Sequence, residues 1–215
     1  MNDGLDAEFD RQRGILLAKG YPKILSLSPA QFIAMIEPLR AVAQASASCR
    51  VPAAPLVQMS FVVIVSSVLA RAENLMPLTS LAGGTAPGVV DRNHGEDELG
   101  SYVPIPVLTV PTAPVYLLID VERGEEFCGV RPDDALAVIL ERDRTPLTIH
   151  EGIALVTQFP GVLEKNRCFM LAGSRRGDRR VPALWISDKA PKLGWCWAGN
   201  PHSWLGTASV ASRAA

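Results

Sequence analysis

One segment near the carboxyl end decides much of the fold of this 215-residue chain: CFMLAGSRRGDRRVPALWISDKAPKLGWCWAGNPHSWLGTASV, residues 168–210. It contains four short apolar runs, CFMLAGS, VPALWIS, LGWCWAG and WLGTASV, whose composition is typical of β-strands. The sequences between these runs, SRRGDRR, DKAP and NPHS, favour turns. We therefore expect an antiparallel meander over about residues 167–210.

The first quarter of the chain predicts helices, over about residues 5–45. Apolar residues recur near helical spacing between residues 5 and 19. The sequence SPAQ, residues 28–31, has an N-cap serine, a proline at the first helical position and the glutamine of a capping box. We expect a second helix there, with a kink at Pro38.

The middle of the chain mixes strand and helix signals. The continuous apolar run FVVIV, residues 61–65, predicts a central strand that is buried on both faces. VYLLIDVE, the turn RGEE and FCGV, residues 115–130, predict a β-hairpin. Helices are expected after Pro132 and after Thr148, which forms a capping box with Glu151. Together these signals predict an α+β fold, with helices packed on a mixed or antiparallel sheet, in one domain spanning residues 1–215.

Composition excludes several classes of protein. The net charge of −1 gives no global attraction to nucleic acid, so we expect no nucleic-acid partner. The apolar stretch 56–70 is shorter than the roughly 20 residues of a membrane-spanning helix, so we expect no membrane association. The acidic amino terminus does not resemble a secretory leader, and the four cysteines are widely spaced. We expect free thiols, a cytoplasmic location, and no metal or other cofactor.

An arginine cluster stands out between the first two predicted strands of the meander. Arg175, Arg176, Arg179 and Arg180 surround Gly177 and Asp178. Four guanidinium groups so close repel one another unless an anion lies among them, and Asp178 supplies one charge. The cluster therefore indicates an anion site, because guanidinium groups bind carboxylate, sulfate or phosphate in a bidentate manner. The alternative is a solvated turn whose arginines pair with acidic residues of the loop 91–98.

All four tryptophans lie in the same quarter of the chain. Trp195 and Trp197 alternate with small residues, so we expect their indoles on one face of a strand. Trp204 and Trp185 are candidates for the same wall. Such an indole surface serves either as core or as the wall of a binding pocket.

The predicted topology brings a second loop to the arginines. In a meander the first and third connections lie at one end of the sheet, so Asn200 and His202 become neighbours of the arginine loop. His202 is a candidate general acid or base, although a surface histidine is the alternative. Asp120, at the end of an apolar run, is a weaker catalytic candidate and also fits a turn. Cys196, between two tryptophans, is expected to be a small buried residue.

Several segments also carry a family resemblance. GDRRVPALWIS, LGWCWAGNPHSWLG and TPLTIHEGIALV resemble an uncharacterised actinobacterial family, the domain-of-unknown-function 5701 family. The resemblance spans most of the chain. It implies an intracellular, single-domain protein and supplies no reaction, cofactor or catalytic residue.

Two functional hypotheses follow. The first is a small-molecule enzyme or ligand-binding protein of bacterial metabolism, including secondary metabolism, whose anionic substrate is held by the arginine cluster beside a tryptophan-lined pocket. The alternative is a protein-protein interaction module that uses an exposed surface of tryptophan and arginine. A concave site would favour the first hypothesis and a flat exposed patch the second.

Overall fold

The structure is a computed structural model that describes residues 3–46, 57–95 and 98–215. The α-helices are α1 (Asp3–Ala18), α2 (Tyr21–Ile24), α3 (Pro29–Ile36), α4 (Leu39–Ala45), α5 (Ala72–Leu75), α6 (Pro132–Glu141) and α7 (Ile149–Gln158). Short 3-10 helices are η1 (Met76–Leu78), η2 (Glu98–Ser101), η3 (Glu125–Phe127) and η4 (Pro160–Val162). The strands are β1 (Gln58–Val65), β2 (Val89–Val90), β3 (Val103–Pro104), β4 (Val115–Glu122), β5 (Thr145–Pro146), β6 (Cys168–Met170), β7 (Ser174–Arg175), β8 (Arg180–Ser187), β9 (Ala190–Trp197), β10 (Leu205–Thr207) and β11 (Ser209–Ala214).

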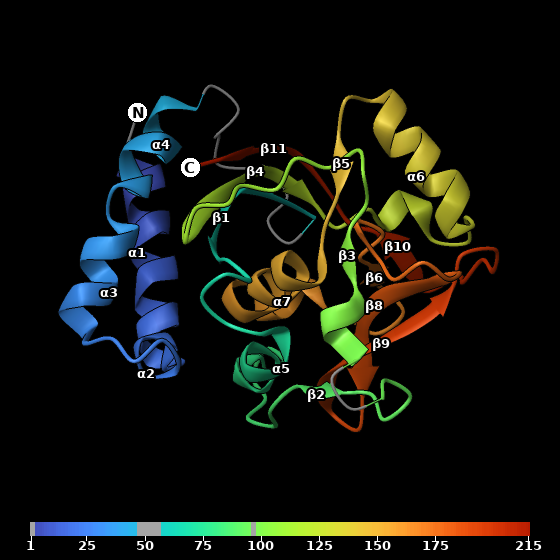
Figure 1. Cartoon of the computed structure of the whole chain (residues 1–215), viewed down its shortest axis with the longest axis horizontal. Coiled ribbons are helices and arrows are strands. Elements are labelled where there is room, and N and C mark those ends of the chain that lie inside the picture. The colour runs from blue at the N-terminus through green and yellow to red at the C-terminus, as the bar shows by residue number, and fades with distance from the viewer. Residues whose placement is uncertain (1–2, 47–56, 96–97) are drawn as a thin grey trace.

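These elements confirm the α+β fold. An antiparallel sheet has the order β1-β4-β11-β5, and a mixed sheet has the order β10-β6-β8-β9-β2. The pair β3-β7 forms a small third sheet. In Figure 1 the helices α1 to α4 stand on one side of the molecule, and the mixed sheet and α6 lie on the other.

Local sequence signals account for the helices. Both predicted capping boxes form, at Ser28 with Gln31 and at Thr148 with Glu151. At the predicted kink the helix ends, and α4 begins one residue after Pro38, because proline has no N–H to continue the helical hydrogen bonds. Among the described residues, no helix combines the length and the apolar character that crossing a bilayer requires.

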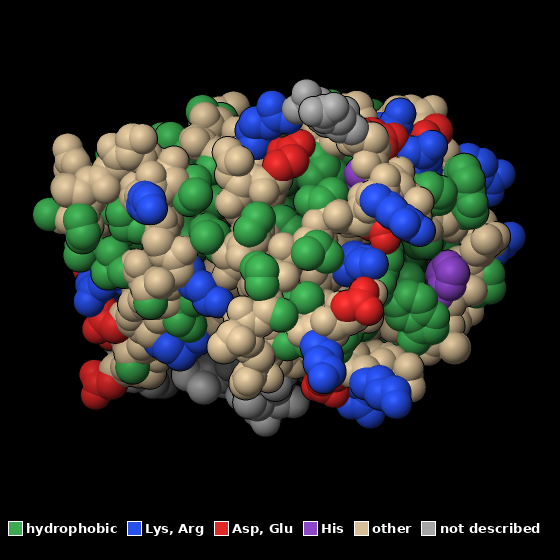
Figure 2. Space-filling view, turned by 90° about the horizontal axis from the view of Figure 1, so that it is seen from below, with side chains coloured by type: hydrophobic (Ala, Val, Ile, Leu, Met, Phe, Trp, Pro, Cys, Tyr) green, Lys and Arg blue, Asp and Glu red, His purple; other side chains and the backbone are tan. Residues whose placement is uncertain are grey.

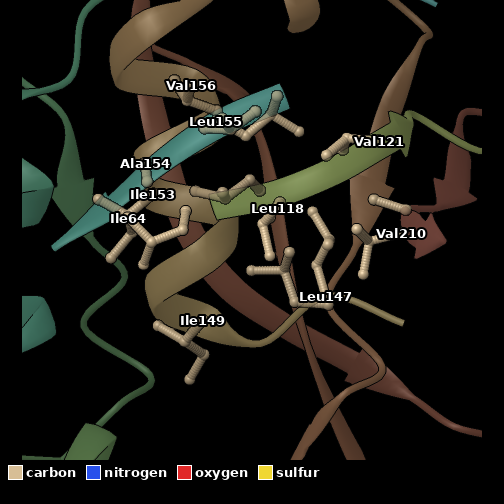
Figure 3. Packing of buried hydrophobic residues seen from close by; sticks show 14 of the residues in the cluster. Ile64, Leu118, Val121, Leu147, Ile149, Ile153, Ala154, Leu155, Val156 and Val210 are labelled. Atoms are coloured by element: carbon tan, nitrogen blue, oxygen red, sulfur yellow. The ribbon is translucent and has the colours of Figure 1, made fainter. Parts of the chain in front are cut away.

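Helix α7 lies at the centre of the fold. Every one of its residues except His150 is buried. A helix that is apolar on all sides needs partners on all sides. Figure 3 shows its side chains packed with Ile64 of β1, Leu118 of β4 and Val210 of β11.

Strand β1 corrects one expectation. It is fully buried from Met59 onward, as its sequence predicts, but it is an edge strand and not a central one. Its free edge is covered by glutamine side chains. Gln12 of α1 donates to the Phe61 carbonyl at 2.8 Å and accepts from the Val63 N–H at 2.9 Å, and Gln158 donates to the Val63 carbonyl at 2.7 Å. The side-chain amides therefore replace a neighbouring strand.

Three of the four predicted strands form the antiparallel meander. β6, β8 and β9 are antiparallel neighbours, whereas the fourth run divides into two strands. β10 returns along the sheet to pair in parallel with β6, and β11 leaves to join β4 and β5 in the other sheet. The predicted antiparallel pairing of this fourth run with β9 was wrong.

The predicted hairpin over residues 115–130 was also wrong. β4 pairs with β1 and β11, and the sequence after it forms η3 instead of a returning strand. Gly124, at φ 73°, makes the turn. A Cβ at Gly124 would collide with the Thr207 carbonyl, and a Cβ at Gly206 would collide with the Gly124 carbonyl. Packing against β10 therefore takes the place of hairpin pairing.

Candidate functional site

The arginine cluster spans the end of β7, the turn that follows it and the first residue of β8. Gly177 adopts a left-handed conformation at φ 83°, and Asp178 accepts a hydrogen bond from the Arg180 N–H at 2.9 Å. This tight turn holds Arg176 and Arg179 between the strand residues Arg175 and Arg180. Their side chains nevertheless separate into two pairs with different surroundings.

The first pair is neutralised within the protein. Arg180 donates to Glu98 Oε1 at 2.6 Å, and Arg176 forms an ion pair with the same oxygen. Asp178 Oδ2 lies 3.4 Å from Arg176 Nε and 3.5 Å from Arg180 Nε. Two carboxylates thus face two guanidinium groups. The alternative that the sequence left open, pairing with the acidic loop, accounts for Arg176 and Arg180.

The second pair lines a groove with a volume of about 480 Å³. Arg175 lies 3.6 Å from Asp133, a distance typical of a loose ion pair, and burial lowers the pKa of Arg175 from its ordinary value. Arg179 is exposed and forms no ion pair with any residue in the described part of the chain. Its guanidinium lies over Gly199, because a Cβ at that position would come within 2.7 Å of Arg179 Nη2.

The remaining wall of the groove is mostly apolar. Leu136 and Leu140 are one turn apart on α6, so they present one face toward the opposing Ile105 and Val107. Val107 is 55% exposed, so the apolar wall is open to solvent. The groove therefore combines two guanidinium groups, the acids Asp133 and Asp178, and an apolar wall.

The tryptophans form two separate pairs. Trp195 and Trp197 are in edge contact at 5.0 Å, and Trp185 and Trp204 are in edge contact at 6.3 Å. Trp185 packs over Gly194, whose side of β9 is opposite to that of Trp195. The expected single wall of indoles was therefore wrong, and none of the four lines the arginine groove.

The pair Trp195 and Trp197 meets the neutralised arginines. The Arg180 guanidinium lies 4.6 Å from the Trp195 ring, a cation-π contact. Trp197 is 45% exposed. This part of β9 is a small exposed aromatic surface.

The 198–204 segment is only partly beside the arginines. Ala198 donates to the Arg179 carbonyl at 2.8 Å, so the two connections meet as expected. Asn200 lies in an exposed turn with Trp197. His202 then packs against Trp204, 5.7 Å between ring centroids, and does not line the groove. The reason is the course of the chain, which runs back along the sheet to start β10 beside Cys168.

Asp120 belongs to the other sheet. It lies in β4 at φ 57° and accepts from Arg144 Nη1 at 3.0 Å, while Arg144 also donates to the Asp120 carbonyl at 2.7 Å. Gln58 donates to its other carboxylate oxygen. These contacts tie β1, β4 and the segment before β5 together, and they separate Asp120 from the arginine loop.

Burial raises the pKa of each cysteine thiol in the described part of the chain. Cys128, Cys168 and Cys196 are free, and Cys49 lies outside the described residues. Cys196 is buried against Met170, as expected, and burial raises its pKa to about 11. A thiolate nucleophile is therefore disfavoured there.

Sequence reasoning missed the residues that divide the cluster. Glu98 contacts Arg180 although the two are 82 residues apart in the sequence. Asp133 approaches Arg175 across 42 residues. The only signal was charge, since Glu98 ends an acidic run and Asp133 opens a helix. Neither Leu136 nor Leu140 carried any sign of a groove, because their spacing is that of ordinary core residues.

Comparison with known proteins gives one positive result. No curated protein and no solved structure matches the chain significantly. A family profile, described as "Family of unknown function (DUF5701)", matches residues 15–215. The chain belongs to this DUF5701 family.

Proposed function

We propose that the protein binds a small anionic molecule in the groove between the arginine loop and α6. The observation that carries this proposal is Arg179, an exposed guanidinium without an ion pair in the described part of the chain, next to the partly buried Arg175. Burial disfavours the charged form of Arg175, and a bound anion would offset that cost.

The apolar wall defines the remainder of the ligand. Leu136, Leu140 and Val107 offer contact surface to an aliphatic or aromatic group. A carboxylate attached to an apolar chain matches both halves of the groove. A highly charged ligand fits less well, because Asp133 and Asp178 lie beside the guanidinium groups.

We propose ligand binding in this groove and assign no reaction to it. His202 does not line the groove, so its role as acid or base stays a prediction without support from the groove geometry. Three free thiols support a cytoplasmic location, which we propose as the place of this function. An actinobacterial origin and a ligand from bacterial metabolism, including secondary metabolism, are further expectations of this proposal.

A protein partner is the second candidate. The exposed Trp197, in contact with Trp195 and close to Arg180, is the observation that favours it, because tryptophan and arginine are enriched at binding hot spots. A nucleic-acid partner is not favoured by the surface charge. On the face seen in Figure 2, Lys and Arg side chains are interspersed with Asp and Glu and do not form a continuous basic patch.

The test uses hexanoate as probe and hexanol as its neutral counterpart. Hexanoate should raise the melting temperature of the wild type, because a ligand that binds only the native state stabilises it. Arg179→Ala should remove this response, Arg179→Lys should weaken it, and Arg92→Ala, at an exposed arginine outside the groove, should leave it intact. The same response in Arg179→Ala as in the wild type would refute the groove as the site.

A further inference from the structure

A second cavity, with a volume of about 310 Å³, lies at the amino-terminal end of α7. Its walls come from the segment after β1, from η2 and β3, and from the first turn of α7. Much of the wall is apolar or aromatic, with Leu99, Tyr102, Val110, Tyr116 and Ile149. The residues lining this cavity and those lining the arginine groove are different, so the two sites are separate.

The main chain at the start of α7 is bonded within the protein. The Thr148 N–H donates to Glu151 Oε2 at 2.8 Å, and the Ile149 N–H donates to Ser174 Oγ at 3.0 Å. The Glu151 N–H donates to Thr148 Oγ1 at 3.4 Å. A helix terminus binds anions through N–H groups that point at the ligand, and these three are already used. The helix end therefore does not favour an anion in this cavity.

His150 supplies a hydrogen-bond acceptor in the wall. Its Nε2 lies 3.0 Å from the Ala70 carbonyl, and because a carbonyl only accepts, the hydrogen of the ring is on Nε2. Nδ1 is then an acceptor, and it forms no hydrogen bond with any residue that the structure describes. The Oγ of Ser66, which also lines the cavity, is enclosed by the protein, whereas Nδ1 is not.

The surroundings of His150 keep the ring neutral. Burial lowers its pKa, while the Ala70 carbonyl, Glu73 of α5 and Glu151 of α7 oppose this shift. The direction is downward, so the neutral ring prevails at neutral pH. In that form the ring holds Nδ1 ready to accept a hydrogen from a hydroxyl group.

The charges of the wall restrict the ligand further. Arg71 and Glu73 both line the cavity and form an ion pair, with Arg71 Nη2 3.2 Å from Glu73 Oε1. Their charges balance each other, so the pair adds no net charge to the wall. A neutral ligand that donates one hydrogen bond matches this cavity better than an ion does.

We propose that the cavity at the start of α7 binds a small neutral phenol, whose hydroxyl donates to His150 Nδ1 and whose ring lies against Leu99 and Val110. The tyrosines of the wall add aromatic surface for a flat ring. This site is independent of the arginine groove.

Isothermal titration calorimetry at neutral pH with phenol tests the proposal, with anisole as the probe that has no hydrogen to donate. Phenol should bind the wild type saturably, and anisole should bind roughly tenfold more weakly, the loss expected for one hydrogen bond. His150→Phe keeps a ring but removes the acceptor, so it should bind phenol and anisole equally. His202→Phe, at a histidine outside the cavity, and Arg179→Ala, in the groove, should bind phenol like the wild type.

A titration of His150 followed by NMR tests the same contact in the wild type. Phenol binds the neutral ring, so saturating phenol should lower the pKa of His150 further, whereas anisole should leave it unchanged. This readout depends on the hydrogen bond to Nδ1 and not on the stability of a variant.

Four results would overturn the proposal. They are absent phenol binding, equal affinities of the wild type for phenol and anisole, an unchanged pKa of His150 with phenol bound, and a preference for phenol that persists in His150→Phe. Loss of phenol binding in Arg179→Ala would assign phenol to the groove, and benzoate binding as tightly as phenol would refute the preference for a neutral ligand.

Discussion

Arg213 of β11 donates to both carboxylate oxygens of Glu151 in α7, from Nε at 2.6 Å and from Nη2 at 2.8 Å. The Glu151 side chain is fully buried and also accepts from the Tyr116 hydroxyl at 3.0 Å and from the Thr148 N–H at 2.8 Å. One carboxylate therefore completes a capping box and joins α7 to both β11 and β4. It balances the buried positive charge of Arg213.

Replacing this carboxylate should destabilise the protein strongly. Glu151→Gln leaves Arg213 buried without its counter-charge, so the free energy of unfolding should fall by about 3–5 kcal/mol in urea titrations. The exposed Glu141→Gln should change it by less than about 0.5 kcal/mol. An effect of Glu151→Gln as small as that of the control would mean that the pair contributes little.

The edge of β1 should depend on one glutamine. Gln12→Ala leaves the Phe61 carbonyl and the Val63 N–H without partners in a buried place, which should cost about 2–5 kcal/mol of unfolding free energy. Gln44→Ala removes one partly buried hydrogen bond, to Asp6, and should cost about 1 kcal/mol. Equal losses in the two variants would contradict the role of Gln12 in covering the strand edge.

Removing Glu98 should expose the anion affinity of the arginine loop. In Glu98→Gln, Arg176 and Arg180 lose the oxygen that both contact, so sulfate should raise the melting temperature of this variant more than that of the wild type. Glu141→Gln is the matched control. The same sulfate response in all three proteins would show that Asp178 alone neutralises the pair.

Stability should fall in mild acid because of His150. Burial lowers the pKa of His150 in the folded state, so between that value and about 6.5 the unfolded chain binds more protons. The contribution of His150 to the free energy of unfolding should therefore be largest above about pH 6.5 and should decrease as the pH falls through this window. Glu73 and Glu151 face this ring and oppose the shift, and His94, whose pKa burial also lowers, contributes a slope of its own.

Chemical unfolding at several pH values measures this effect. His150→Gln should reduce the slope of the unfolding free energy against pH by up to about 1.4 kcal/mol per pH unit, the contribution of one proton. Identical slopes in the variant and the wild type would show that the protonation of His150 is not coupled to folding.

Local signals explain what could be predicted. The capping boxes at Ser28 and Thr148 form because their partners are three residues away, and the turn at Gly177 depends on its own backbone. The strand character of residues 61–65 was also readable, since β-branched apolar runs favour burial in sheets. None of these local signals specifies which other strand will lie next to a given strand in the sheet.

The candidate site shows the same division. The sequence located the arginines and indicated that Cys196 is buried. It predicted that the tryptophans share one wall, whereas Trp185 and Trp195 lie on opposite faces of the sheet. It also expected His202 at the arginines. That expectation assumed that the chain after β9 reverses beside it, whereas β10 pairs with β6.

By itself the sequence determined the capped helices α3 and α7, the strand character of apolar runs such as residues 61–65, and the charge of the arginine loop, because each of these depends on residues close together in the chain. Only the tertiary structure decided that Glu98 neutralises Arg176 and Arg180, that Arg175 and Arg179 face a groove, and that Ser66 lies beside the start of α7. Those relationships join residues far apart in the chain. They follow from the packing of the two sheets around α7, for which local propensity carries no information.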